Sequence, residues 1–292
     1  MAVHNAIRKR TTGDYVIFVI LTFLMLVIAI PFYNTIVISV ETSAAYARNP
    51  LSLYPAEFSL DNYRFMFKNN AILYGYRNTV FIAAIGLVYG MTISVMMAYA
   101  FSRQFPGKKF FFLLMLFTMF FGGGTVPTFL IMKKLKLINK LLGIILMSGV
   151  SSFNIIIMKN GFESTPPALE EAALIDGAND LQIFLRVMLP LQKPLLATFS
   201  LFTIVSYWNS WYWPLLLLNS PTKQTLQVVL RAIVNDASQA TEVASSGSAT
   251  AQTFSQGVKM AAVMITMGPI MIVYPFLQKY FNKGVMVGAI KM

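Results

Sequence analysis

The chain alternates between long uncharged hydrophobic stretches and shorter segments that hold its charged residues. A transmembrane helix needs about 20 mostly apolar residues, with a range of roughly 17–25, to cross the hydrocarbon core of a bilayer. Several stretches of about this size contain no Asp, Glu, Lys, Arg or His. They predict six transmembrane helices in one all-α integral membrane domain, residues 1–292: Tyr15–Val40, Thr79–Ser102, Phe110–Met132, Leu141–Met158, Pro194–Thr222 and Met260–Gln278.

The first hydrophobic stretch, 15–40, is interpreted as an uncleaved transmembrane helix rather than a signal peptide. Its apolar run is longer than the roughly 7–15 residues of a signal-peptide core, and no small-residue cleavage site follows it. The whole chain is therefore expected to be a membrane protein.

Composition agrees with this class and excludes several others. Of the 292 residues, 57% are hydrophobic and 12% are charged, against roughly 25% charged residues in soluble proteins. The chain has no cysteine, which excludes disulfides and cysteine metal clusters, and its single histidine, His4, excludes a histidine-based metal site or catalytic triad. We therefore expect no metal site. The net charge of +12 comes from basic residues between the spans, which is typical of anchors at lipid headgroups rather than of a nucleic-acid-binding patch.

The basic residues give only weak information on orientation. The cluster Arg8–Arg10 favours a cytoplasmic N-terminus, and six spans then return the C-terminus to the cytoplasm. The four lysines of segment 133–140 lie outside in this arrangement, so Lys and Arg are shared almost equally between the two sides. We choose this arrangement because the first helix usually dominates. Segments 41–77 and 219–259 are then outer loops, and part 240–256 is expected to be mobile because it is rich in Ser, Thr, Ala and Gly.

A polar segment, residues 163–190, separates the fourth span from the fifth, and we call it the elbow. Thr165 can cap a helix whose first residue is Pro166, where the missing proline N–H does no harm. Gly177 supplies the left-handed residue that ends this helix. One face of the helix, at spacings i, i+3, i+4 and i+7, is expected to meet a partner, and it consists of Leu169, Ala172, Ala173 and Asp176.

A second short helix is expected to follow within the elbow. Asn179 or Asp180 can cap it, and it should run through Arg186. Pro190 and Pro194 stop it before the fifth span. Two short helices lying along the membrane surface are suited to being gripped by a protein outside the membrane, whereas the alternative is an ordinary amphipathic loop.

The elbow contains the pattern E-A-A-x2-D-G-A-x5-F-x2-V-x-L-P-x3-P, with every fixed position filled from Glu171 to Pro194. This pattern resembles the cytoplasmic coupling motif of permease subunits of ATP-binding-cassette (ABC) importers. In that family the element docks in a cleft of the cytoplasmic ATPase and transmits its closure. The resemblance implies that the ATPase-coupling residues are Glu171, Ala172, Ala173, Asp176, Gly177 and Ala178.

The resemblance implies the fold of a type I ABC importer permease, a bundle of six transmembrane helices with a cytoplasmic coupling helix, in a bacterial cytoplasmic (inner) membrane. Both termini would be cytoplasmic. The partners would be a homologous permease subunit in a heterodimer, two ATP-binding cassette ATPase subunits and an extracytoplasmic solute-binding protein. The chain has no G-x4-G-K-[ST] phosphate loop. It would therefore bind no cofactor and be no enzyme, with ATP and Mg²⁺ bound by the partner ATPase.

The fifth span carries a second, less specific resemblance. Its W-N-x3-W-P segment resembles the fifth helix of carbohydrate-type permeases, with one additional tryptophan. The aromatic rings and the amide in this segment either line a sugar path, by stacking and hydrogen bonding, or form an aromatic belt at the membrane interface. The residues in question are Trp208, Asn209, Trp211 and Tyr212.

Two other segments each have two interpretations. Gly122–Gly124, followed by Pro127, either permits close helix packing or breaks the third span near the translocation path. The C-terminal tail, residues 281–292, resembles the tail of the maltose-type second permease, which implies contact with the ATPase through Gly288 and Lys291. The alternative for the tail is a frayed basic end.

The expected cargo is a carbohydrate, and the length of both outer loops favours an oligosaccharide. The outer Lys and Arg residues favour acidic oligosaccharides such as uronates by steering, unless they only anchor headgroups. The main alternative function is an ion-coupled secondary sugar transporter, but such carriers usually place ionisable groups inside the membrane and these spans have none. A membrane-embedded enzyme would lack His, Cys and paired carboxylates. Composition alone does not separate a transporter from a structural subunit.

Overall fold

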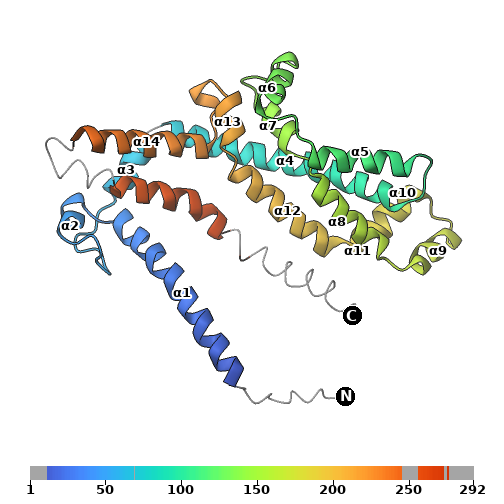
Figure 1. The fold of residues 1–292 in the computed structure, drawn as a ribbon, viewed down its shortest axis with the longest axis horizontal. Coiled ribbons are helices and arrows are strands. Elements are labelled where there is room, and N and C mark those ends of the chain that lie inside the picture. Colours follow the sequence, from blue (N-terminus) through green and yellow to red (C-terminus); the bar gives the residue numbers. More distant parts are fainter. Residues whose placement is uncertain (1–11, 69, 245–255, 273–274, 276–292) are drawn as a thin grey trace. The chain divides into compact units, whose positions relative to one another are not determined.

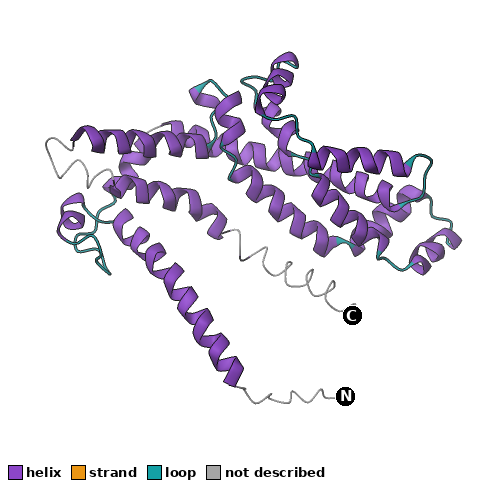
Figure 2. Cartoon of the chain, in the orientation of Figure 1, coloured by secondary structure: helices purple, strands orange, loops and turns teal. Residues whose placement is uncertain are grey.

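The computed structural model describes residues 12–68, 70–244, 256–272 and 275 of the chain. Within this part the secondary structure is helical, apart from one isolated β-bridge between Glu41 and Phe58 (Figures 1 and 2). The contacts divide the chain into two compact units, residues 1–68 with 233–265 and residues 69–232 with 266–292. The expected all-α architecture is confirmed for the described residues.

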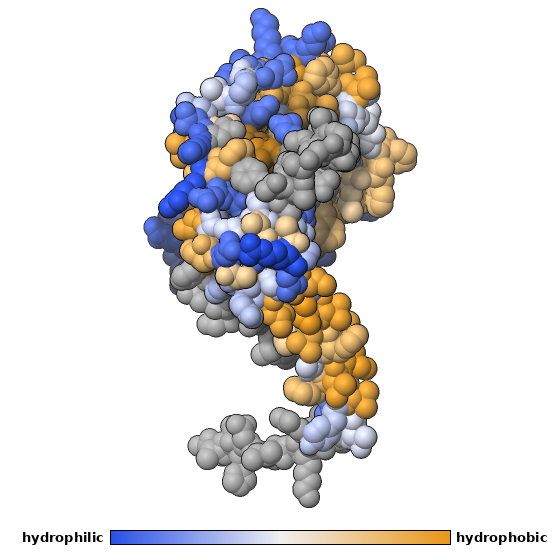
Figure 3. Space-filling view, turned by 90° about the vertical axis from the view of Figure 1, so that its left-hand side faces the viewer, coloured by the Kyte–Doolittle hydropathy of each residue, from blue (hydrophilic) through white to orange (hydrophobic). Residues whose placement is uncertain are grey.

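The first unit begins with α1 (Thr12–Ser39), a helix that is apolar on all of its faces. Its large side chains are exposed along most of its length, and burial is confined to its last turn, from Val37 to Ser39. The apolar surface of α1 is the orange column in Figure 3. A helix that is hydrophobic all round and long enough to cross a bilayer is typical of a membrane span, in agreement with the predicted span 15–40.

Two short helices follow α1 within the predicted loop 41–77. They are α2 (Ser43–Arg48) and α3 (Asp61–Lys68). The buried amide of Asn62 in α3 donates to the carbonyl oxygens of Ser39 and Glu41, each at 3.2 Å. These two hydrogen bonds fix α3 to the end of α1.

The second unit is built around α4 (Asn70–Ser102), which packs against α7 (Leu141–Ser148), α8 (Ser152–Glu163) and α12 (Lys193–Trp208). Glycines in α4 allow these approaches. A Cβ at Gly90 would overlap the carbonyl oxygen of Gly149, and a Cβ at Gly86 would overlap the ring of Tyr207. The Tyr207 hydroxyl in turn donates to the Ile145 carbonyl at 2.8 Å. Small residues at helix contacts are typical of packing within membranes.

The helix α4 begins earlier than the predicted start at Thr79. Arg77 and Asn78 interrupt the apolar pattern, but the backbone remains helical through both, back to Asn70. The extension is stable because its polar groups have partners: the Asn78 amide donates to the Thr222 and Gln224 carbonyls at 2.9 Å. The sequence pattern marked where the apolar stretch begins and not where the helix begins.

Several of the predicted spans are divided helices. The stretch 110–132 forms α5 (Lys108–Phe120) and α6 (Thr125–Lys134), which are bent by 116° about the glycine run (Figure 1). No atom crowds Gly122 or Gly124, and Gly124 has a φ of +79°. The helix is therefore broken at this run, as one of the two interpretations expects, and no described residue packs closely on Gly122 or Gly124. The position of the break near the translocation path stays a prediction. The stretch 141–158 is likewise bent by 49° between α7 and α8.

By length and composition, α1 and α4 can each cross a membrane, and three bent helix pairs pass the same test when each pair is taken as one span. The pairs are α5 with α6, α7 with α8, and Asp180–Leu191 with α12. The predicted fifth span, 194–222, is interrupted after Trp208 and continues as α13 (Tyr212–Leu217) and a 3₁₀ turn, η2 (Pro221–Lys223).

The predicted outer loop 219–259 contains a helix that sequence analysis missed, α14 (Leu226–Ala244). It is amphipathic rather than uniformly apolar, so a search for uncharged stretches does not find it. An apolar helix at Gln256–Ile272 covers most of the predicted sixth span. Residues 245–255 of the predicted loop and residues 273–274 and 276–278 of the predicted span lie outside the described residues.

The two ends of α4 hold different groups of loops. At its N-terminal end, the Leu226 N–H donates to Thr79 Oγ1 at 2.9 Å. The same end holds segment 133–140, because the Asn139 amide bonds the Ser220 hydroxyl at 2.7 Å. At its C-terminal end, Arg103 pairs with Glu170 of the elbow. Successive spans cross the membrane in opposite directions, so the connections after the third span (133–140) and after the fifth span (219–259) must lie at one end. The elbow, which follows the fourth span, must lie at the other end.

The contact between α4 and the turn that joins α7 to α8 can be tested with Gly90→Ala. The added methyl group overlaps a backbone carbonyl, which has less freedom to move than a side chain, and we expect a loss of about 1–3 kcal/mol of stability. A fluorescence thermal-shift measurement on the purified protein in detergent should show a lower unfolding temperature. Gly122→Ala is the matched control, because no heavy atom lies within 4 Å of a Cβ there. Equal destabilisation by both substitutions would contradict the packing described.

Candidate functional site

The first helix of the elbow is α9 (Pro167–Ile175), and its N-cap residue is Pro166. The expected cap at Thr165 is therefore wrong by one residue, because the Thr165 hydroxyl accepts a hydrogen bond from the Gln192 side chain at 3.1 Å instead. The end of the helix is as predicted: Gly177 has a φ of +81°, a conformation that favours glycine.

The second part of the elbow begins at Asn179, which confirms one of the two expected caps. Asn179 Oδ1 accepts from the Gln182 N–H at 2.9 Å, and Gln182 Oε1 accepts from the Asn179 N–H at 3.0 Å, which makes a capping box. The expected end at Arg186 is wrong. The chain remains helical through α10 (Asp180–Ile183), η1 (Phe184–Met188) and α11 (Leu189–Leu191). The segment η1 is one turn of π-helix. The wider backbone of a π-helix makes room for the ring of Pro190, which has no N–H to donate.

The elbow has an inner face that packs on the second unit's own core. Ala173 and Ala178 are half-buried against a cluster that includes Ile183 and Met188 of the elbow and Phe162 of α8. The expected partner-facing stripe is therefore split, because Ala173 points inward. The role of Ala173 and Ala178 in this conformation is to seat the elbow.

The outer face of the elbow, which we define as Glu171, Ala172, Leu174, Ile175 and Asp176, is exposed. Ile175 is 86% exposed and Leu174 is 52% exposed. Sequence analysis missed these two apolar residues, which occupy the variable positions of the motif. Exposed apolar side chains beside two carboxylates are typical of a surface that another protein covers.

Arg103, which directly follows α4, holds the elbow in place. Its guanidinium forms an ion pair with Glu170, lies 4.6 Å from the ring centre of Tyr99 and donates to the Tyr99 hydroxyl at 2.9 Å. The Tyr99 ring in turn contacts the Phe184 ring at 4.6 Å. Both helical parts of the elbow are thus joined to one end of α4. Sequence analysis missed Arg103 and Glu170, although Arg103 is the first charged residue after a long uncharged span.

The charge state of this link follows from its contacts. Burial lowers the pKa of the Arg103 guanidinium, but the hydrogen bond to Glu170 and the proximity of Tyr99 raise it, and the net direction is upward from the ordinary value. Arg103 therefore keeps its positive charge at neutral pH. Two further ion pairs lie where the elbow begins. The Glu163 carboxylate lies 2.6 Å from Lys159 Nζ and 3.6 Å from Lys108 Nζ.

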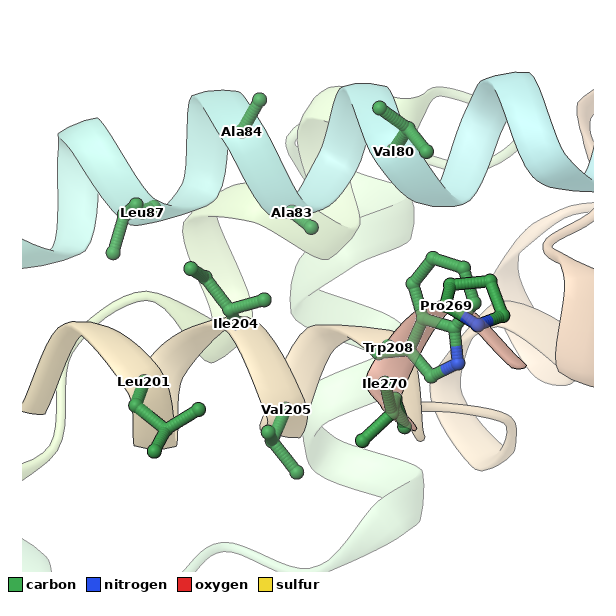
Figure 4. Close-up of a pocket in the computed structure, with 10 residues that line it drawn as sticks. All are labelled: Val80, Ala83, Ala84, Leu87, Leu201, Ile204, Val205, Trp208, Pro269 and Ile270. Carbon is green, nitrogen blue, oxygen red and sulfur yellow. The ribbon is translucent and has the colours of Figure 1, made fainter. Parts of the chain in front are cut away.

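The second candidate site is the break in the fifth span, and it divides the four expected path residues. Trp208 is only 7% exposed, and its Nε1–H donates to the Thr266 carbonyl at 3.1 Å. It lines a cavity of about 320 Å³ whose other walls are apolar side chains of α4 and α12 with Pro269 and Ile270 (Figure 4). Among the described residues that line this cavity, no polar side chain is free to bind a sugar, because the indole N–H of Trp208 already donates to Thr266.

The other three residues lie on the exposed side of the break. Asn209, Trp211 and Tyr212 are exposed, and the guanidinium carbon of Arg231 lies 4.0 Å from the Trp211 ring centre. Tyr212 and Thr125, the first residues of α13 and α6, share a hydrogen bond of 2.9 Å between their hydroxyls. The breaks in the third and fifth spans are thus joined. Sequence analysis missed Arg231 because it belongs to α14.

Other expected sites are not placed by the structure. Gly288 and Lys291 of the C-terminal tail lie outside the described residues. Within the described residues, no group of three or more His, Cys, Asp and Glu side chains could hold a metal ion.

Comparison with known proteins identifies the class of this fold. Over residues 6–287 the chain matches the family described as the binding-protein-dependent transport system inner membrane component. It is 39% identical over 284 residues to the polygalacturonan/rhamnogalacturonan transport system permease protein YtcP of Bacillus subtilis (strain 168), covering 97% of this chain and 99% of that protein. It is 29% identical over 275 residues to the arabinooligosaccharides transport system permease protein AraQ of Halalkalibacterium halodurans, covering 92% and 93%.

A solved structure extends the comparison to three dimensions. The chain resembles, with a TM-score of 0.82 and 32% identity over 93% of its length and 99% of the other's, a chain in the crystal structure of a bacterial ABC transporter involved in the import of the acidic polysaccharide alginate. The expected type I importer permease fold is confirmed. The chain therefore belongs to the family of binding-protein-dependent transport system inner membrane components, as a transport permease of an ABC importer.

Proposed function

We propose that this permease pairs with a homologous permease subunit and forms half of the translocation path for an oligosaccharide. Two ATPase subunits on the cytoplasmic side bind ATP and Mg²⁺ and carry out hydrolysis. An extracytoplasmic solute-binding protein delivers the cargo, and the elbow and both termini face the cytoplasm. The observation that carries the proposal is the outer face of the elbow.

The outer face of the elbow has the properties of a docking surface for the ATPase. It exposes Leu174 and Ile175 next to Glu171 and Asp176, so it offers apolar contact area with negative charge at its border. Apolar side chains this exposed, outside the membrane, gain free energy when a partner covers them. The turn at Gly177 presents them without using the residues that seat the elbow.

The contacts behind the elbow support a mechanical role. When the ATPase dimer closes on ATP, it pulls the outer face of the elbow. The pair of Arg103 with Glu170 and the contact of Tyr99 with Phe184 carry that movement to α4, around which the second unit is packed. The elbow then moves together with the helix bundle, as alternating access requires.

The cargo we propose belongs to the acidic, uronate-containing class. The relative YtcP is named for polygalacturonan and rhamnogalacturonan, and the similar solved transporter imports alginate. AraQ is named for arabinooligosaccharides, so a neutral oligosaccharide is the second candidate. Uptake of labelled acidic and neutral oligosaccharides by the reconstituted complex decides between them.

The docking proposal can be tested at Gly177 and Glu171. Gly177→Val forces a β-branched side chain into a positive-φ position, at a cost of about 1–2 kcal/mol or more, and Glu171→Lys reverses a charge on the outer face. We expect both variants to insert in the membrane but to lose ATPase co-purification and cargo-stimulated hydrolysis. Gly177→Asn is the matched control, because asparagine tolerates this backbone conformation. Full stimulated hydrolysis in both variants would contradict the proposal.

The link between the elbow and α4 can be tested with a double-mutant cycle. Arg103→Ala and Glu170→Ala should each reduce the cargo transported per ATP hydrolysed, because the elbow then moves without α4. The double variant should be little worse than either single one, since both remove the same interaction. Transport and hydrolysis are measured together in proteoliposomes. Strictly additive losses would show that the two residues act independently.

The orientation can be tested with single cysteines, which need no background substitutions because the chain has none of its own. Asp176→Cys lies on the elbow and Ser220→Cys lies at the other end of the second unit. An impermeant thiol reagent added to spheroplasts, in which the cytoplasmic membrane is intact and accessible from outside, should label position 220 and not position 176. Labelling of both positions from one side would rule out the proposed topology.

A further inference from the structure

Acidic and basic residues are separated along the second unit. Between residues 69 and 232, all of the acidic residues lie at the elbow end, and they are Glu163, Glu170, Glu171, Asp176 and Asp180. At the opposite end, where segments 133–140 and 219–232 lie, the charged residues within the same range are all basic, and they include Lys133, Lys134, Lys136, Lys140, Lys223 and Arg231. The acidic residues of α14, Asp236 and Glu242, follow beyond residue 232. On the proposed orientation, this cationic end faces outward. A surface of one sign attracts cargo of the opposite sign.

Among these cations, Arg231 is held in a fixed position. Its guanidinium lies 4.0 Å from the centre of the Trp211 ring. Stacking on an aromatic face fixes the plane of a guanidinium and leaves its edge N–H groups free. Within the described part of the chain, no carboxylate forms an ion pair with Arg231. The free edge has the geometry that binds a carboxylate through two parallel hydrogen bonds.

The surroundings of Arg231 suit a sugar. Trp211 and Tyr212 are 39% and 41% exposed, and exposed rings can stack on the C–H faces of pyranoses. Asn209 adds an exposed amide that can donate to and accept from hydroxyls. The hydrogen bond between Tyr212 and Thr125 fixes this surface to the break in the third span. Broken helices in transporters supply binding groups beside the cargo path.

We propose that Arg231, supported by Trp211, binds the carboxylates of a uronate oligosaccharide at the outer entrance of the permease. This assignment rests on the proposed function. Arg231 selects charge, Trp211 and Tyr212 provide stacking surfaces, and the lysines at the same end raise the local concentration of the acidic chain. A phosphate of a lipid headgroup shares the anionic chemistry, but it does not use the exposed rings and amide beside Arg231.

The test uses the complete complex of permeases, ATPases and solute-binding protein in proteoliposomes. The probes are a galacturonate tetrasaccharide and the same tetrasaccharide with its carboxylates methyl-esterified. For Arg231→Gln we expect uptake of the charged probe to fall about tenfold, the loss that removal of a charge-assisted hydrogen bond produces, with uptake of the ester and basal ATP hydrolysis unchanged. Trp211→Ala should lower uptake of both probes, and of the charged one more, because it removes the support of Arg231 as well as a stacking surface.

Lys134→Gln is the matched control, because it removes one exposed positive charge at the same end without an aromatic support. It should reduce uptake of the charged probe less than twofold. Equal effects of the Arg231 and Lys134 substitutions, or equal losses of both probes in Arg231→Gln, would overturn the assignment in favour of general steering or headgroup binding. Unchanged uptake of the charged probe in Arg231→Gln would overturn it while the importer function stands. If the unaltered complex takes up neither probe in an ATP-dependent way, the proposed function itself fails.

Discussion

Close backbone contact along α4 is the constraint on which the rest of the second unit depends. Lipid tails are as apolar as leucine, so helices in a bilayer gain little by burying apolar side chains, and packing at short range must hold them together. Gly86 and Gly90 allow this close packing, since any side chain at these positions would overlap Tyr207 or Gly149. Because α4 has 33 residues, its ends lie roughly 50 Å apart. One element therefore connects the elbow to the opposite set of loops.

Features set by a few neighbouring residues could be predicted from the sequence. Gly177 was recognised as the left-handed end of the first elbow helix because that conformation favours glycine, and Asn179 was recognised as a cap because its side chain bonds the next turn. The break at Gly122–Gly124 was one of two interpretations that the sequence left open. The continuation of the elbow helix past Arg186 was missed, since a π turn before a proline has no simple sequence signal.

Features set by distant contacts could not be predicted in this way. Helical spacing places Ala173 on the same face as Ala172, but the core behind the elbow decides which of them is covered. An aromatic segment in a membrane span does not reveal that the Trp208 N–H is taken by Thr266. Trp211 belongs to the predicted fifth span and Arg231 to the predicted outer loop 219–259, and hydropathy gives no sign that these two residues are in contact. The fold could therefore be predicted from the sequence more fully than the contacts within the candidate sites.

The distribution of charge accounts for the weakness of the orientation signal in the sequence. The positive-inside rule assumes that basic residues near a membrane act in insertion and anchoring, and on that assumption the lysines at 133–140 are on the wrong side. If these residues and Arg231 instead attract an acidic cargo, they are held outside by function and do not report on insertion. The carboxylates of the elbow do not enter this comparison, because the rule counts Lys and Arg and is not a net-charge rule. On the proposed orientation, selection of an acidic cargo at the outer end thus acts against the topological signal.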